Sequence, residues 1–272
     1  MWCPYMDREI WQSIIGFVSQ QRYPVLPCPY CMEKSLAIDI ESINYRKSTP
    51  SQERDFFTKE LDSELQKYSE ITKQNTFLGV LLYLGAAASN MQKEYAKFIC
   101  FFKCKNCGGD VSAAGTSQCP LDRKNTTIAE KSLLKIEYFS PPVPFFNVGA
   151  SVPISVKNEV LQSFNHFHSD LLTSGAKLRR SIEKLCSELG FKGKTLHGSI
   201  SAMTEKFPRE AELLHSLKLL GNEATHADSV SEEDLLNAFE IQEYVLGMFE
   251  RIEAEKRAEE KAKKLMNKFD RS

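Results

Sequence analysis

The sequence predicts an α+β fold, with a small sheet in the first half of the chain and helices alone in the second half. Three observations lead to this class. Two Cys-x-x-Cys motifs, at 28–31 and 104–107, have strand-like residues around them, apolar residues recur at helical spacing between the motifs, and five helical patterns follow residue 153. The 272 residues, 42% of them hydrophobic, can form two modest domains. We place these domains at residues 1–145 and 146–272.

The first domain combines strand patterns with a helical insertion. It opens with a short amphipathic segment that contains Ile10, Trp11 and Ile14, and strands are expected over residues 35–40, 95–102 and 132–139. From about residue 51 to residue 93, apolar residues recur at helical spacing, with a second apolar helix over residues 75–88. The sequence therefore predicts a helical insert of about residues 51–93 between the two Cys motifs.

The two Cys motifs predict a metal site. A tetrahedral zinc ion takes four soft ligands, and a two-residue spacer lets a tight turn direct both thiolates of a motif at one point. Gly108 and Gly109 follow the second motif, where small residues let backbone amides turn toward the sulfurs. The 72 residues between the motifs, 32–103, exceed the roughly 15–20 of the usual pattern, and the insert accounts for the excess. We predict a zinc ribbon with one structural Zn²⁺ on Cys28, Cys31, Cys104 and Cys107.

Two nearby cysteines are alternative ligands for this ion. Cys100 precedes the second motif by four residues, and Cys119 follows it. Eight cysteines in a chain without a visible secretory signal indicate metal ligands and buried thiols, not a disulfide framework. The longest apolar run, residues 77–88, is shorter than the roughly 20 residues that span a bilayer. We therefore expect a soluble, cytoplasmic protein with no membrane contact.

The second domain is expected to be a helical bundle. After a proline-rich break at 141–144, helices are predicted at residues 155–172, 175–189, 195–206, 208–225 and 231 to about 265. Gly190 suits a left-handed helix cap, Pro208 suits a first helical turn, and Ser231 suits an N-cap followed by acidic residues.

The last predicted helix has more apolar surface than one face needs for its own core, which predicts a symmetric dimer through the bundle. The residues on which this expectation rests are Phe239, Tyr244, Val245, Met248, Phe249 and Ile252. Beyond them the helix continues as a solvated segment of alternating charge.

Four motifs from residue 130 onward suggest a family. They are residues 134–138 (LKIEY), 152–154 (VPI), 178–183 (LRRSIE) and 220–226 (LGNEATH). Behind a zinc ribbon, this series resembles the DUF4145 domain family over about residues 130–250. The resemblance implies a bundle similar to the HEPN-like helical bundles of bacteria and archaea, which occur alone, behind zinc ribbons, or fused to restriction and anti-phage proteins.

The same resemblance implies a candidate catalytic site. Catalytic HEPN ribonucleases use an arginine, a polar residue and a histidine, and Asn222 and His226 match the last two, four residues apart on one helix face. Gly221 stands where the arginine is expected. Residues that would have to complete the site are Lys218, Arg179, Arg180 and Glu183. Two roles remain open for His226 and Asn222: a hydrogen-bonded joint in the bundle or dimer, and acid–base catalysis.

The charge balance excludes a strong overall attraction to nucleic acid, because 35 basic residues face 36 acidic ones. A local basic cluster with neighbouring aromatic rings could still contact phosphates and stack on bases, or could be a strand with core aromatics beside exposed lysines. This cluster consists of Lys103, Lys105, Arg123 and Lys124, with Phe101 and Phe102.

The sequence contains no nucleotide-binding glycine loop, hydrolase serine motif or metalloprotease helix. We therefore expect a dimeric binding and assembly module that recognises nucleic acid or a partner protein. The resemblance places it in a prokaryotic defence or restriction system. The alternative is a metal-independent HEPN-type endoribonuclease that uses His226.

Overall fold

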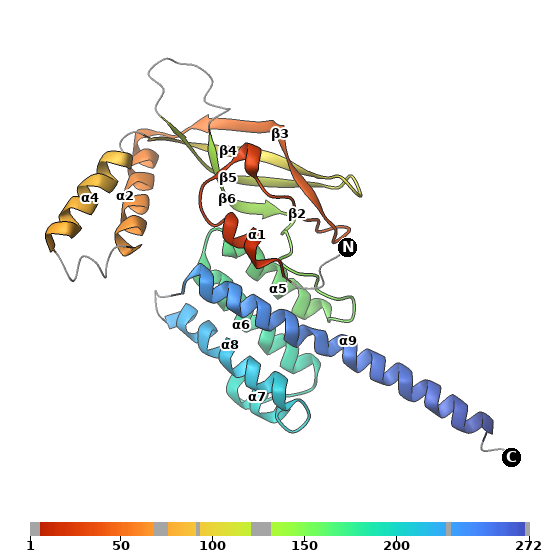
Figure 1. Ribbon diagram of the computed structural model, residues 1–272. Coiled ribbons are helices and arrows are strands. Elements are labelled where there is room, and N and C mark those ends of the chain that lie inside the picture. Colours follow the sequence, from red (N-terminus) through yellow and green to blue (C-terminus); the bar gives the residue numbers. More distant parts are fainter. Residues whose placement is uncertain (1–5, 68–75, 91–92, 121–131, 227–229, 270–272) are drawn as a thin grey trace. The chain divides into compact units, whose positions relative to one another are not determined.

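The computed structural model describes residues 6–67, 76–90, 93–120, 132–226 and 230–269 of the chain (Figure 1). It contains an antiparallel sheet and a C-terminal helical region, so the predicted mixture of strands and helices is confirmed. The chain forms two compact units. One consists of Met1–Gln12, Leu26–Ser35 and Pro141–Ser272, and the other consists of Ser13–Val25 and Leu36–Ser140.

The sheet has six strands in the order β1-β6-β5-β4-β3-β2, and the pairs β1–β6, β3–β4, β4–β5 and β5–β6 are antiparallel. A 3₁₀ turn, η1 (Gln20–Arg22), lies between the first two strands in sequence. The strands are β1 (Val18–Ser19), β2 (Leu26–Pro27), β3 (Lys34–Lys47), β4 (Lys93–Cys104), β5 (Asp110–Pro120) and β6 (Leu133–Ser140). The three strands expected from the sequence are present as β3, β4 and β6.

Strand β4 separates a buried face of the sheet from an exposed one. Its even-numbered residues from Phe98 to Cys104 are buried, whereas Ile99 and Phe101 between them are exposed, as the two-residue period of a strand requires. Phe102 is fully buried, and its ring lies 5.4 Å from that of Tyr23 and 5.6 Å from that of Phe139. The core of the sheet is therefore on the Phe102 side.

Strand β5 is absent from the sequence-based expectation. Its eleven residues are mostly serine, alanine, glycine and threonine, with Val111 and Thr116 as its only β-branched residues, so neither apolar alternation nor β-branched content marks it as a strand. Long-range pairing makes it a strand, because β4 and β6 bind its two edges. At the register shift after Ala114, Gly115 lies so close to β6 that an added Cβ would be 2.1 Å from the carbonyl oxygen of Lys135.

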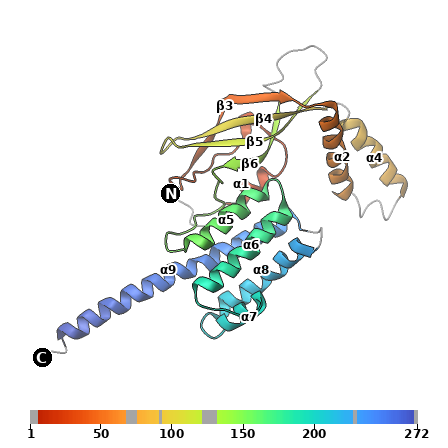
Figure 2. The same cartoon turned by 180° about the vertical axis from the view of Figure 1, so that it is seen from behind.

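The predicted helical insert is confirmed as helices α2 (Pro50–Lys67) and α4 (Thr76–Asn90), which lie side by side at one end of the sheet (Figures 1 and 2). Phe56 of α2 packs against Tyr95 of β4, with ring centroids 5.5 Å apart. The ammonium group of Lys97 lies 4.8 Å from the centre of the Phe56 ring. These contacts hold α2 against the start of β4.

All five helices predicted for the second half are present. They are α5 (Ile154–Phe167), α6 (Leu171–Glu188), α7 (Leu196–Met203), α8 (Pro208–His226) and α9 (Glu232–Phe269). The predicted caps also hold. Gly190 has φ +84°, Pro208 is the first residue of α8, and the hydroxyl of Ser231 accepts a hydrogen bond from the backbone N–H of Asp234 at 3.2 Å.

The short helix α1 (Arg8–Ser13) joins the helical unit through aromatic packing. The indole of Trp11 stacks on Phe145 with centroids 3.8 Å apart, and Phe145 in turn contacts Phe164 and Phe239 at 5.1 and 5.0 Å. Nothing local in the sequence connects Trp11 with Phe145, which lies 134 positions later. Residues 6–12 belong to the same compact unit as the C-terminal helices, and Met6, Ile10 and Trp11 are buried.

The apolar face of α9 is used inside the helical unit, which corrects the basis of the dimer expectation. Phe239, Val245, Met248 and Phe249 are buried by their own chain. Of the six residues that suggested a dimer, only Tyr244 is exposed. The surplus of apolar residues therefore fills the bundle core, and a dimer through this face stays a prediction without that support.

Replacing Gly115 by alanine should lower the free energy of unfolding by about 2 kcal/mol, because overpacking against a fixed backbone carbonyl forces the strands apart. Gly16→Ala is the matched control, since an added Cβ at Gly16 meets nothing within 4 Å. Chemical denaturation of the metal-loaded protein measures both variants. Equal stabilities for Gly115→Ala and Gly16→Ala would contradict the close approach of β5 and β6.

Candidate metal centre

The pairing of β3 with β4 brings the two Cys motifs together. Leu36 near the start of β3 lies opposite Cys104 at the end of β4. The first motif ends at Cys31, three residues before β3 begins at Lys34, and the second motif begins at Cys104 itself. The antiparallel pairing of β3 with β4 therefore brings the two motifs together in space although 72 residues separate them in sequence.

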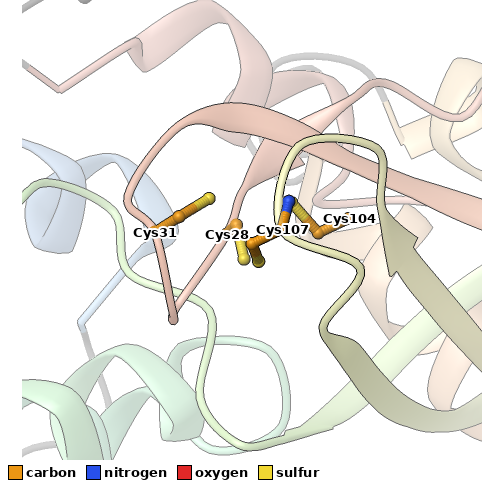
Figure 3. Close-up of side chains that lie close together, drawn as sticks. All are labelled: Cys28, Cys31, Cys104 and Cys107. Carbon is orange, nitrogen blue, oxygen red and sulfur yellow. The ribbon is translucent and has the colours of Figure 1, made fainter.

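The four sulfur atoms of Cys28, Cys31, Cys104 and Cys107 all lie within 4.8 Å of one another (Figure 3). None of the four is in a disulfide. In a tetrahedral site with zinc–sulfur bonds of 2.3 Å, the sulfurs are separated by about 3.8 Å. A small contraction of the group would reach that geometry, so the four cysteines could hold one metal ion.

The first motif is a tight turn in which both the N–H and the carbonyl of Cys28 form backbone hydrogen bonds. The N–H of Cys28 donates to the carbonyl of Glu33 at 2.9 Å, and the N–H of Met32 donates to the carbonyl of Cys28 at 2.9 Å. The N–H of Tyr30 points at the sulfur of Cys28 at 3.4 Å. An amide directed at a thiolate stabilises its negative charge, which favours metal binding.

The second motif repeats this pattern. The N–H of Cys104 donates to the carbonyl of Gly109 at 2.9 Å, and the N–H of Gly108 donates to the carbonyl of Cys104 at 3.0 Å. The N–H of Cys107 points at the sulfur of Cys104 at 3.4 Å. Two turns of the same construction therefore present their sulfurs to each other.

Both turns place the residue after the second cysteine in the left-handed region. Gly108 has φ +74°, as its glycine suggests, and Met32 has φ +62°. A left-handed conformation costs a residue with a side chain about 1–2 kcal/mol. The first motif adopts this conformation despite the cost, so the two motifs share the same left-handed turn after their second cysteine.

The two alternative ligands lie elsewhere. Cys100 is buried on the core face of β4, where burial raises the pKa of its thiol to about 12 and disfavours the thiolate that a metal needs. The sulfur of Cys119 lies 3.0 Å from the hydroxyl oxygen of Ser132. Neither belongs to the four-sulfur group.

The candidate catalytic residues are brought together in part. Arg179 of α6 donates a hydrogen bond to the side-chain oxygen of Asn222 on α8, and its Nε lies 3.5 Å from a carboxylate oxygen of Glu183. A Cβ at Gly221 would be 2.7 Å from the Cβ of Arg179, so glycine lets α6 and α8 approach at this point. Arg179 therefore lies beside Gly221, the position at which the HEPN resemblance leads us to expect an arginine.

The other candidates are not part of this contact. Arg180 pairs with Glu159 at 2.9 Å, and Lys218 is half-buried on α8. His226 is the last residue of α8, and its side chain lies outside the part of the chain that the structure describes. The backbone positions of Asn222 and His226 are about one helical turn apart on α8.

The exposed face of the sheet carries three large apolar residues that we call the outer stripe: Ile99, Phe101 and Tyr138. Between 48% and 59% of each is exposed to solvent. Ile99 and Tyr138 both lie opposite Ala114, one on each side, so they occupy one row across β4, β5 and β6. Sequence alternation predicted the strands but did not show which parity would face solvent.

Charges beside the outer stripe are balanced. The ammonium group of Lys97 lies 2.9 Å from a carboxylate oxygen of Glu137, and Lys103 stands directly opposite Asp110. Of the predicted basic cluster, Lys103 and Lys105 are exposed. Phe102 is buried and cannot stack on a base, which agrees with the alternative of a core aromatic beside exposed lysines. Residues 123 and 124 lie outside the described residues.

Comparison with known proteins supports a domain family for part of the chain. Residues 158–268, within α5–α9, match the family model described as a domain of unknown function, DUF4145. No curated protein and no solved structure gives a significant match. The segment similar to this family is therefore the helical region, and the match does not extend to the sheet or the Cys motifs.

Cys104→Ser should reduce the metal content from about one ion per chain to almost none, because three thiolates and a hydroxyl form a much weaker soft-metal site. Cys119→Ser is the control, since Cys119 is also buried but lies outside the four-sulfur group. Elemental analysis of protein purified without chelator measures both. A wild-type protein without metal, or equal metal loss in the two variants, would contradict the proposed ligand set.

Proposed function

We propose that this protein is a zinc-stabilised binding and assembly module of a prokaryotic defence or restriction system. Four cysteine sulfurs favour zinc or iron, and two Cys-x-x-Cys turns suit a structural zinc of the zinc-ribbon type. A shell of four thiolates leaves no position for a catalytic water. The ion would therefore stabilise the fold and take no part in a reaction.

The outer stripe is the observation that carries the binding role. Three large apolar side chains exposed on neighbouring strands are costly in water unless another molecule covers them. Aromatic residues are enriched at the centre of protein interfaces, where charged residues are depleted and lie instead at the rim. A pocket of about 400 Å³ adjoins the second Cys motif on the same unit. It is lined by Ala37, Ile38, Asp39, Lys103, Cys104, Lys105 and Gly108.

The charges favour a partner protein over nucleic acid. Nucleic-acid affinity depends on unpaired cations that displace counterions from phosphates. Lys97 and Lys103 already face Glu137 and Asp110, and the whole chain has a net charge of −1. Stacking on Phe101 and Tyr138 would then have to supply nearly all of the affinity for a single strand. We therefore propose a protein ligand for the outer stripe, with nucleic acid as the competing possibility.

Phe101→Ala with Tyr138→Ser should abolish partner binding without loss of folding, because both side chains already face solvent. A photo-crosslinking amino acid placed at position 101 should give one discrete protein adduct in the source cells, and Tyr138→Ser should remove it. Position 219, also exposed but on α8, is the control for non-specific adducts.

Fluorescence anisotropy with single-stranded DNA and RNA tests the competing possibility. Binding should be absent at physiological salt. Binding tighter than about 10 µM that weakens with salt and is lost in Lys103→Glu would contradict the protein ligand and establish nucleic acid instead.

A second candidate function is metal-independent cleavage of RNA, favoured by the contact between Arg179 and Asn222. This contact supplies a guanidinium close to the position where Gly221 replaces the arginine expected from HEPN ribonucleases. The guanidinium is engaged by Asn222 and lies 3.5 Å from the Glu183 carboxylate, which offsets its charge. We therefore propose that Arg179, Asn222 and Glu183 act as a joint between α6 and α8.

The purified protein should accordingly show little or no ribonuclease activity, since losing a transition-state cation typically lowers rates by about 10²–10³. Arg179→Ala should lower the free energy of unfolding by about 1–3 kcal/mol through the unsatisfied Asn222, whereas Arg180→Ala should change it by less than about 0.5 kcal/mol. Denaturation and multiple-turnover RNA assays check both statements. RNA cleavage that His226→Ala and Arg179→Ala abolish at unchanged melting temperature would establish the enzyme instead.

A further inference from the structure

Helix α4 exposes a continuous row of large apolar side chains that neither the metal centre nor the outer stripe involves. Phe77, Val80, Leu81 and Leu84 are between 54% and 79% exposed. Their spacing of three, one and three residues places them on one face of the helix, and we call this row the α4 stripe.

The whole of α4 is apolar or small. From Thr76 to Asn90 the sequence contains no charged residue, although exposed faces of helices in water normally carry charged side chains. The side of α4 opposite the α4 stripe is covered within the chain. Gly79 on that side of α4 is buried, and so is Leu61 of the neighbouring helix α2. A helix that is apolar on both its covered and its exposed side is typical of one buried on all sides. The α4 stripe therefore indicates a further partner.

We propose that the α4 stripe binds the α4 stripe of a second copy of this chain, in a two-fold symmetric helix pair. A symmetric contact sets one surface against itself, so a surface without charge meets no unpaired charge in its partner. A partner with charged side chains at the contact would have to bury them unpaired against α4. The uncharged stripe thus complements itself best.

A lipid surface is a poorer fit than a second copy. No helix in the described part of the chain is both long and apolar enough to cross a bilayer. Helices that lie in a membrane interface carry lysine and arginine on their polar side. In this hairpin α4 has no charge and α2 has five acidic and three basic residues, so the pair is negative and anionic lipids would repel it.

The size of the stripe sets the expected strength of the contact. Apolar patches on monomers reach about 300–600 Å², whereas a standard stable interface covers about 800 Å² on each partner. One stripe of four residues falls in the lower range, so the dimer should be weak, with a dissociation constant on the order of micromolar. The assembly surface would then lie on α4 and not on α9, whose apolar face is buried.

Sedimentation equilibrium of the full, metal-loaded chain from about 1 to about 200 µM, a range around the expected dissociation constant, tests the proposal. Wild-type protein should pass from monomer to dimer over this range. Leu81→Glu should weaken the dimer at least tenfold, because it buries a charge at the centre of the contact. Leu265→Glu on α9 is the matched control, since Leu81 and Leu265 are both 58% exposed, and it should leave the dimer unchanged.

The double variant Val80→Ser with Leu84→Ser repeats the test with small neutral side chains in case a charge unfolds the hairpin, and circular dichroism confirms folding. A wild-type protein that stays monomeric throughout, a dimer that both α4 variants leave intact, or a dimer lost in Leu265→Glu would each overturn the proposal. Wild-type binding to phosphatidylcholine–phosphatidylserine vesicles that Leu81→Glu abolishes would overturn it in favour of lipid. None of these outcomes depends on what the outer stripe binds.

Discussion

The pairing of β3 with β4 is the contact on which the metal centre, the insert and the exposed sheet face all depend. At one end of this pair, Leu36 lies opposite Cys104 and the two Cys motifs meet. At the other end, Lys47 lies opposite Ala96, and the chain leaves the sheet for α2 and α4 and returns. The same two strands therefore close the insert at its base and bring four thiols together at their far end.

A metal ion at the Cys104 end would also determine which side of the sheet faces solvent. Cys104 and Phe102 share one parity on β4, and Phe101 belongs to the other. A slip of one residue would bury Phe101 and expose Phe102. Because the metal would link Cys104 to the first motif, it would penalise that slip strongly. Metal binding by the thiolates would thus fix the register of the strands, and that register determines that the outer stripe faces solvent.

Local signals in the sequence predicted much of this arrangement. The Cys spacing identified the four sulfurs that lie together, and helical periodicity with caps such as Gly190 and Ser231 identified the helices. Features set by distant contacts escaped prediction. Strand β5 forms because β4 and β6 pair with its two edges. Trp11 stacks on Phe145, which lies 134 positions later in the sequence. Burial of Phe239 and Val245 likewise depends on helices far away in sequence. Nor could periodicity show that Arg179 would approach Gly221.

The most direct test of this account is X-ray absorption spectroscopy at the zinc edge on protein purified without chelator. Four thiolates from Cys28, Cys31, Cys104 and Cys107 predict a single shell of four sulfur atoms at about 2.3 Å, with no nitrogen or oxygen ligand. That result would establish the four-cysteine metal site at the end of β3 and β4. A shell with fewer than four sulfurs, a nitrogen or oxygen ligand in its place, or no bound zinc would contradict it.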